Sequence, residues 1–391
     1  MKTILKNCIV VLPEGLLPDG AVVIDESGRI EYVGSESNLP AIEGTYRDLG
    51  GRYLAPGLID IHVHGGNGIT FGENDLAATT AFYSNWAASN GVTGYLMSVA
   101  EETSQALLEM ITDYVKVFRN PPAGAEPLGL HLEGPYLSVE KKGAFNPAWL
   151  RNPDVKEAKA YLQAGQGWIH QITIAPELPN VSQVARIFRE ADVVVALGHT
   201  NISYEEASQA LKGDFNHVTH AFNAQRGFDH RAPGVFGAVL TSETVTAELI
   251  ADCVHVHPGA MKLLLRCLGS DRVVAITDAM SGAGLAEGNY HLVGHSVTVK
   301  DGRATLENGT LAGSVATLNQ CVANLIKYVD LPLHEAVKMA SLNPARVIGA
   351  ADRLGSITEG KDANLIVIDE DINVFQTMVK GQIVYNQYDQ E

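Results

Sequence analysis

The amino-acid sequence predicts an α/β fold: a (β/α)₈ TIM-type barrel with a small β-sandwich domain built from both termini. Two observations support this prediction. In residues 55–349, short apolar segments alternate with segments of helical periodicity, a pattern typical of a parallel sheet. In residues 1–54 and 350–391, apolar runs are interrupted by Gly, Pro and Asp, which favours strands joined by turns. We therefore expect the two ends to form the small domain and the middle to form the barrel.

The chain ends are the first element of this prediction. The stretch "GAVVIDESGRIEYVG" near the start and the stretch "ANLIVIDEDINVFQTMVKGQIVYNQ" near the end both consist of apolar runs separated by turn residues. This pattern suits a β-sheet rather than helices. Because both β-rich ends flank a middle of different character, they are expected to fold together.

The barrel strands come next. Eight short apolar segments are followed in turn by segments of helical pattern, as repeated βα units require. The expected strands are residues 57–64, 91–99, 127–134, 168–177, 192–200, 215–223, 245–256 and 272–280. The expected helices include residues 75–89, 104–118, 180–191, 203–211 and 259–268.

Two local features refine the prediction. Ser203 precedes a helical segment and Glu206 follows three residues later, the spacing of a capping box that begins a helix at this point. After the last barrel strand, residues 287–310 alternate apolar and polar residues around Gly and Asp turns, which indicates a β-hairpin excursion.

Composition excludes some classes of function. The net charge of −17 argues against nucleic acid or an anionic membrane as a partner, but it leaves an anionic small substrate open. No apolar segment reaches membrane-spanning length, and the run "CIVVL" is too short for a signal peptide. Four cysteines lie far apart and form no CxxC pair, so we expect a cytoplasmic protein without a disulfide framework.

Polar side chains stand at the carboxyl ends of the expected barrel strands. In a barrel these ends converge on one mouth, where catalysis takes place, so the side chains should lie close together. His62 and His64 alternate along one strand and therefore share a face, about 7 Å apart along the backbone. The full set is His62, His64, Glu133, His199, His220, His255 and Asp278.

Each of these residues alone has an ordinary structural explanation. An H-x-H pair is often a polar strand end, a glutamate often pairs with a cation, and a single histidine is often buried in a core. With His255 left aside, four histidines, a glutamate and an aspartate on one rim are harder to explain as independent accidents. Imidazole and carboxylate ligands without a thiolate suit Zn²⁺ or Fe²⁺, with Mn²⁺ or Co²⁺ as alternatives.

These residues occur in stretches that resemble the amidohydrolase superfamily and, within it, the N-acetylglucosamine-6-phosphate deacetylases. The resemblance runs over nearly the whole chain. "HLEGP", "THAFNA" and "TDAM" are fairly specific to the deacetylases, whereas H-x-H is common to the superfamily. Further matching stretches are "APGLIDIHVHGGNG", "LGHTNISYEEA", "IADCVHVHPGA", "GTLAGSVATLNQCV" and "GSITEGKDANLIVID".

The resemblance implies a ligand set. Glu133, His199 and His220 would hold one metal ion, and His62 with His64 a second, with Glu133 bridging the two ions and Asp278 nearby. Some members of the family lack the H-x-H pair and use one metal ion, so its presence here predicts two ions per chain. The fourth expected strand, "WIHQITIAPE", has no lysine that could serve as the carboxylated bridge of other relatives.

The resemblance also implies a substrate and a partner. The reaction would be hydrolysis of the N-acetyl group of N-acetylglucosamine 6-phosphate to glucosamine 6-phosphate and acetate. Asp278 would carry a proton from the attacking water to the departing amine. Asn223, Ala224 and His255 would bind the phosphate, together with an Arg231 supplied by the neighbouring subunit of a homodimer.

One position departs from the family pattern. Phe145 stands where relatives commonly have a polar residue that can donate a hydrogen bond to the acetyl carbonyl. Either the second metal ion polarises the carbonyl here, or the substrate differs from the usual one. The alternative functions are a deacetylase of another N-acetyl amino-sugar phosphate, such as N-acetylgalactosamine 6-phosphate, or a different amidohydrolase activity. A third alternative is a binding protein that has kept the fold and lost the catalytic activity. Such a protein would be expected to lose metal ligands, and here all six ligand positions are filled.

Overall fold

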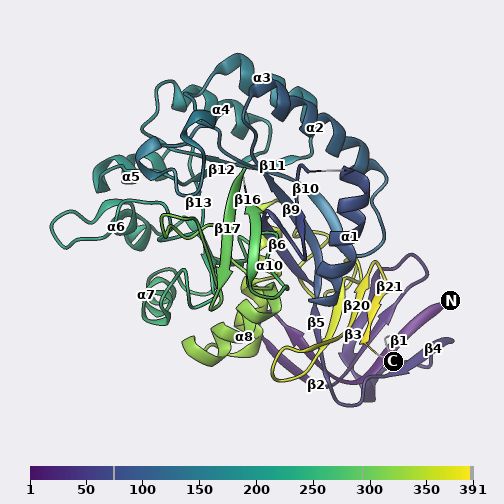
Figure 1. Ribbon diagram of the computed structural model, residues 1–391. Coiled ribbons are helices and arrows are strands. Elements are labelled where there is room, and N and C mark those ends of the chain that lie inside the picture. Colours follow the sequence, from purple (N-terminus) through teal and green to yellow (C-terminus); the bar gives the residue numbers. More distant parts are fainter. Residues whose placement is uncertain (74, 293, 388–391) are drawn as a thin grey trace.

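The structure, a computed structural model, describes residues 1–73, 75–292 and 294–387. Within these ranges, eight parallel strands form one sheet that curves into a nearly closed barrel (Figure 1). The fold class predicted from the sequence is confirmed, and every barrel strand falls inside or next to its predicted segment. In hydrogen-bonded order the strands are β15 (Val273–Ile276), β14 (Thr246–Ile250), β13 (His217–Val218), β12 (Val194–Leu197), β11 (Ile169–Ile174), β10 (Glu126–Glu133), β9 (Val92–Val99) and β6 (Leu58–Val63).

The first and last strands of the barrel meet at its seam. Asp278 N donates a hydrogen bond to His62 O at 2.8 Å. One residue earlier, Thr277 Oγ1 donates to Asp60 Oδ2 at 2.6 Å. The seam therefore brings the carboxyl end of β6 beside that of β15, although more than two hundred residues separate them in the chain.

Helices surround the barrel on the outside (Figure 1). The five predicted helices are present, with ends that differ by at most one residue, and the capping box before α5 is confirmed: Ser203 N donates to Glu206 Oε2 at 2.8 Å. The α-helices of the described ranges are α1 (Leu76–Ser89), α2 (Ser104–Arg119), α3 (Val155–Gly165), α4 (Val181–Glu190), α5 (Tyr204–Leu211), α6 (Gly234–Thr241), α7 (Pro258–Leu268), α8 (Leu318–Val329), α9 (Leu333–Met339) and α10 (Leu342–Val347). Short 3₁₀ helices span η1 (Glu36–Asn38), η2 (Val139–Lys141) and η3 (Pro147–Trp149). No helix within the described ranges is long and apolar enough to cross a membrane.

Both chain ends contribute to a second, mixed sheet, as expected (Figure 1, purple and yellow). Strand β5 joins the two ends, because it pairs with β1 on one side and with β19 on the other. Only Gly57 separates β5 from barrel strand β6. The exact domain boundaries therefore stay a prediction. The strands of this sheet are β21 (Gln382–Asn386), β20 (Val374–Val379), β19 (Leu365–Ile368), β5 (Tyr53–Pro56), β1 (Lys2–Leu12), β2 (Gly15–Ile24) and β3 (Ile30–Ser35), with β4 (Gly44–Asp48) paired to β1.

The predicted excursion after the last barrel strand is an antiparallel sheet of three strands. They are β16 (Gly288–Leu292), β17 (His295–Lys300) and β18 (Arg303–Thr305). A further short pair, β7 (Gly65–Gly66) and β8 (Ile69–Thr70), follows β6 directly. The three-stranded sheet and the short pair lie at the mouth of the barrel, beside the carboxyl ends of the barrel strands.

The inside of the barrel is polar. On β10 the side chains alternate, as on any strand. Leu130 and Leu132 pack outward into the main hydrophobic core, whereas His131 and Glu133 point inward. His131 is held between Ser98 Oγ and Thr173 Oγ1, each 2.8 Å from a ring nitrogen. This hydrogen-bonded interior lies directly beneath the polar residues at the carboxyl ends of the strands.

Candidate active site

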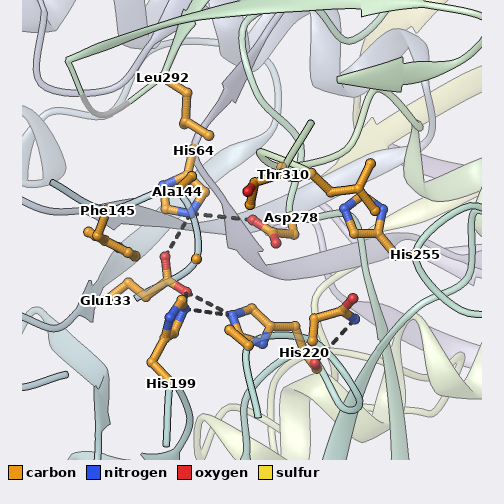
Figure 2. A pocket seen from close by; sticks show the side chains of 15 residues that line it. His64, Glu133, Ala144, Phe145, His199, His220, His255, Asp278, Leu292 and Thr310 are labelled. Atoms are coloured by element: carbon orange, nitrogen blue, oxygen red, sulfur yellow. Dashed lines mark hydrogen bonds and ion pairs between the residues drawn. The ribbon is translucent and has the colours of Figure 1, made fainter. Parts of the chain in front are cut away.

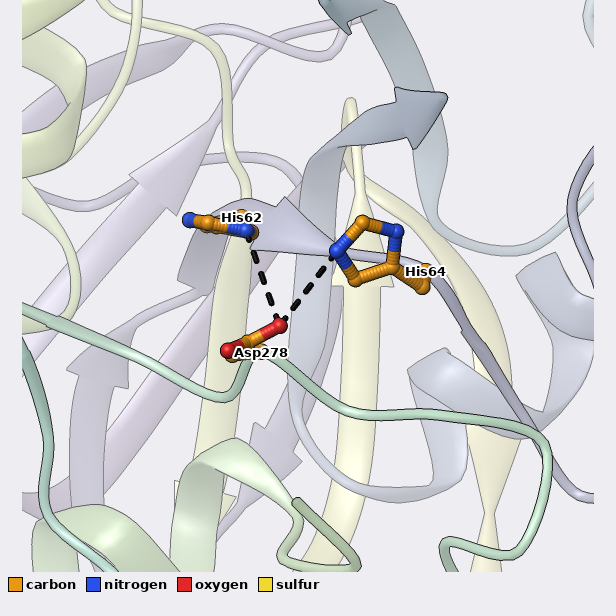
Figure 3. Close-up of side chains that lie close together, drawn as sticks. All are labelled: His62, His64 and Asp278. Atoms are coloured by element: carbon orange, nitrogen blue, oxygen red, sulfur yellow. Dashed lines mark ion pairs between the residues drawn. The ribbon is translucent and has the colours of Figure 1, made fainter. Parts of the chain in front are cut away.

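The six predicted ligands form two groups at the carboxyl ends of the barrel strands (Figures 2 and 3). In each group, the potential ligand atoms of the three residues lie within 4.8 Å of one another. One group is His62, His64 and Asp278, and the other is Glu133, His199 and His220.

Glu133 stands between the two groups (Figure 2). Its Oε2 lies 3.1 Å from His64 Nε2. Its Oε1 lies 3.1 Å from His199 Nε2 and 3.0 Å from His220 Nε2. One carboxylate thus contacts histidines of both groups.

Asp278 completes the first group (Figure 3). Its Oδ1 lies 3.6 Å from His62 Nε2 and 3.4 Å from His64 Nε2. The backbone of Asp278 has a φ of 48°, and two residues of the second group, His199 and His220, have φ of 47° and 26°. A left-handed conformation costs a residue with a side chain about 1–3 kcal/mol and is typical of functional sites, where it aims a side chain.

The donor atoms suit a divalent cation. His62 Nδ1 lies 2.9 Å from Glu248 Oε2, and His199 Nδ1 lies 2.9 Å from the carbonyl oxygen of Lys141. Both partners accept hydrogen bonds, so in the neutral form of each ring, the form that binds a metal ion, the proton sits on Nδ1 and the lone pair of Nε2 faces the centre of the site. The Nε2 of His62 is buried and has no hydrogen-bond partner among the described residues. A metal ion would satisfy it.

Positive charge stabilises the buried carboxylate of Glu133. Burial alone would raise the pKa of Glu133, but the charge of His62 and hydrogen bonds from His199 and His220 hold it well below its usual range. Burial would lower the pKa of His64, but Asp278 and Glu133 raise it to about 9. Glu133 therefore stays ionised beside the histidines, and a divalent cation would supply the same positive charge once the histidines have lost their protons.

A cavity of about 290 Å³ opens above the ligands (Figure 2). This volume is near the lower end of the range for small-molecule sites. Strand β16 contributes Leu292 to its wall, and the loop after β18 contributes Thr310, Leu311 and Gly313. The remaining lining residues are His64, Glu133, Gly143, Ala144, Phe145, His199, His220, Asn223, Ala224, His255 and Asp278.

Three of the four predicted phosphate contacts, Asn223, Ala224 and His255, line this cavity. His255 is held by Asp252, whose Oδ2 lies 2.7 Å from His255 Nδ1. Arg231 is exposed on the loop after Ala224 and is not among the described residues that line the cavity of its own chain.

Phe145 forms part of the wall next to the second ligand group. Its ring stands edge-on to the ring of His199, with the two centroids 5.3 Å apart. The side chain is buried and has no hydrogen-bond donor, so this side of the cavity is apolar. The loop reaches His199 because Gly143, at a φ of 57°, has no side chain; a Cβ there would come within 3.2 Å of the ring.

Glu248, a fully buried residue of β14 beneath the two groups, was not predicted from the sequence. Burial would raise its pKa, but the charge of His62 and a hydrogen bond from His217 hold the pKa well below the usual range. The only signal in the sequence was an acidic residue inside the apolar run "VTAELIADC".

Comparisons with known proteins place the chain in a family. Residues 53–384 match the model of the Amidohydrolase family. The chain is 33% identical over 386 residues to N-acetylglucosamine-6-phosphate deacetylase of Bacillus subtilis (strain 168), covering 98% of this chain and 97% of that protein. It is 35% identical over 335 residues to N-acetylgalactosamine-6-phosphate deacetylase of Escherichia coli O157:H7, covering 84% and 87%. A solved structure of a mutant N-acetyl-D-glucosamine-6-phosphate deacetylase from Mycobacterium smegmatis, in complex with N-acetyl-D-glucosamine 6-phosphate, gives a TM-score of 0.90 at 31% identity and covers 99% of both chains.

Proposed function

The chain belongs to the amidohydrolase family and, within it, to the N-acetylglucosamine-6-phosphate deacetylases, and from this premise we propose that it hydrolyses the N-acetyl group of N-acetylglucosamine 6-phosphate. The products are glucosamine 6-phosphate and acetate. The observation that supports the proposal most strongly is the pair of ligand groups joined by Glu133 at the base of one cavity.

Two divalent ions per chain fit these groups. His62, His64 and Asp278 would hold one ion, and His199 and His220 the other, with Glu133 shared. Zn²⁺ or Fe²⁺ suits the imidazole and carboxylate donors best, with Mn²⁺ or Co²⁺ as alternatives. When bound, such ions lower the pKa of water and polarise a carbonyl oxygen.

Asp278 is the group that moves the proton. Burial would raise its pKa, but His62 and His64 lower it, so the carboxylate is ionised and can accept a proton from the attacking water. Asp278 also lines the cavity, so the same carboxyl group can return the proton to the departing amine. One group then serves both halves of the hydrolysis.

The 6-phosphate binds at the far side of the cavity, at Asn223, Ala224 and His255. Arg231 of a neighbouring subunit completes this site, which makes the protein a homodimer. Holding the phosphate at a distance from the amide fixes the orientation of the reacting group. The four free cysteines are consistent with a cytoplasmic enzyme.

Acetate release from a panel of purified substrates tests the function. The panel contains N-acetylglucosamine 6-phosphate, N-acetylgalactosamine 6-phosphate, unphosphorylated N-acetylglucosamine and an N-acyl amino acid. We expect turnover of the first and a strict requirement for the phosphate. Turnover of the N-acyl amino acid in preference to the sugar phosphates would contradict the proposal.

The galactosamine isomer is a second candidate substrate. It is favoured by one observation, the 35% identity to a protein named for that activity. The two sugars differ only in the configuration at C4, so the ratio of their kcat/KM values in the same panel decides between them.

Replacement of Asp252 by asparagine tests phosphate recognition. Burial would lower the pKa of His255, but its hydrogen bond to Asp252 raises it, which favours the protonated ring, whose Nε2–H can donate to a phosphate. We expect Asp252→Asn to raise KM for the phosphorylated substrate about tenfold while kcat changes about twofold or less. The metal content and kcat of the same sample are the internal controls, and an unchanged KM for the phosphorylated sugar would contradict a role in phosphate binding.

A further inference from the structure

The carboxylate of Glu248 lies beneath the two groups of candidate ligands and contacts one residue of each group. In the part of the chain that the structure describes, it belongs to neither group and does not line the cavity. Its Oε2 lies 2.9 Å from His62 Nδ1 and accepts a hydrogen bond from the backbone N–H of His220 at 3.0 Å. Its Oε1 accepts from Gln171 Nε2 at 2.6 Å and lies 3.2 Å from His217 Nε2.

The contact with His62 decides which ring nitrogen carries the proton. An ionised carboxylate only accepts hydrogen bonds, so it holds the proton on Nδ1 and leaves a lone pair on Nε2. That Nε2 is buried without a hydrogen-bond partner, and it lies 3.6 Å from Asp278 Oδ1. A carboxylate behind a ligating histidine also makes the ring a stronger base and fixes its orientation.

The second group does not have this support. His199 is oriented by a neutral backbone carbonyl, that of Lys141, and His220 contacts Glu248 only through its backbone. Removal of the negative charge of Glu248 should therefore act mainly on His62.

We propose that Glu248 is a positioning residue that enables the group His62, His64 and Asp278 to hold its metal ion. The two-ion state of the chain then depends on a residue of β14 that touches neither substrate nor metal. This inference rests on the proposed two-ion site.

Titration of the metal-free protein with Co²⁺ or Zn²⁺, followed by calorimetry and by metal analysis, tests the proposal without measuring activity. For the unchanged chain we expect two ions. For Glu248→Gln we expect one ion bound as before and the other bound 10–100-fold more weakly. His64→Ala, which removes a ligand of the same group, should give the same one-ion state.

Gln171→Leu is the matched control. It removes a buried partner of the other carboxylate oxygen of Glu248 and leaves the contact with His62 in place, so both ions should bind normally. If Glu248→Gln does not fold, Glu248→Asp keeps the charge but withdraws the carboxylate by one methylene, and it should weaken the same ion.

The possible failures are distinguishable. Two ions bound at unchanged affinity by Glu248→Gln would overturn this inference and leave the proposed function intact. Equal weakening of both ions would also overturn it, because Glu248 would then support the whole site. A single ion in the unchanged chain would overturn both the two-ion proposal and this inference.

Discussion

Replacement of Asp278 by asparagine is expected to lower kcat for deacetylation by about 10³-fold, within the range that general acid–base catalysis contributes. Asparagine has nearly the same shape, and its carbonyl oxygen can still face His62 and His64, which lie 3.6 and 3.4 Å from the present carboxylate oxygen. It cannot accept a proton from water or deliver one to an amine. The measurement is acetate release at saturating N-acetylglucosamine 6-phosphate, with metal content determined on the same sample.

The metal content separates two explanations of a low rate. A variant that keeps both ions and loses turnover has lost proton transfer, whereas one that loses an ion has lost a ligand. Asp301→Asn, at an exposed turn between β17 and β18, is the matched control and should leave the rate unchanged. Near-normal turnover of Asp278→Asn with both ions bound would show that another group moves the proton.

The sequence predicted those features of the candidate site that follow directly from the barrel fold. Parallel strands in a barrel all point their carboxyl ends at one mouth, so polar residues that end apolar runs must converge. His62, His199 and Asp278 were found in this way. The capping box at Ser203 could be predicted for a similar reason, because both partners lie within one turn of helix.

Contacts between distant residues could not be predicted. Glu248 and His62 are 186 positions apart, and nothing in the run around Glu248 indicates which side chain its carboxylate meets. The same holds for Phe145, whose contact with His199 depends on how one loop folds over the mouth. Strand β13 is also far shorter than residues 215–223, because the backbone turns at His220 with a φ of 26°.

The largest effect on metal binding is expected from Glu133→Gln. Both carboxylate oxygens are in use: Oε2 faces His64, and Oε1 faces His199 and His220. An amide offers one oxygen and one NH₂ group, and the NH₂ group cannot ligate a cation. The substitution therefore removes the bridge together with one negative charge. We expect both ions to bind more weakly and kcat/KM to fall by at least about 10³-fold, since metal assistance supplies several kcal/mol.

Glu126→Gln provides the matched control for this experiment. Glu126 begins the same strand, β10, at the opposite end of the barrel, where it pairs with Arg353 and Lys380. Its loss should leave metal content and turnover unchanged. Together with Glu248→Gln, these variants separate the two groups: a change at Glu248 weakens one ion and a change at Glu133 weakens both. If Glu133→Gln retained two ions at unchanged affinity, Glu133 would not be the shared ligand, and the two groups would act as independent sites.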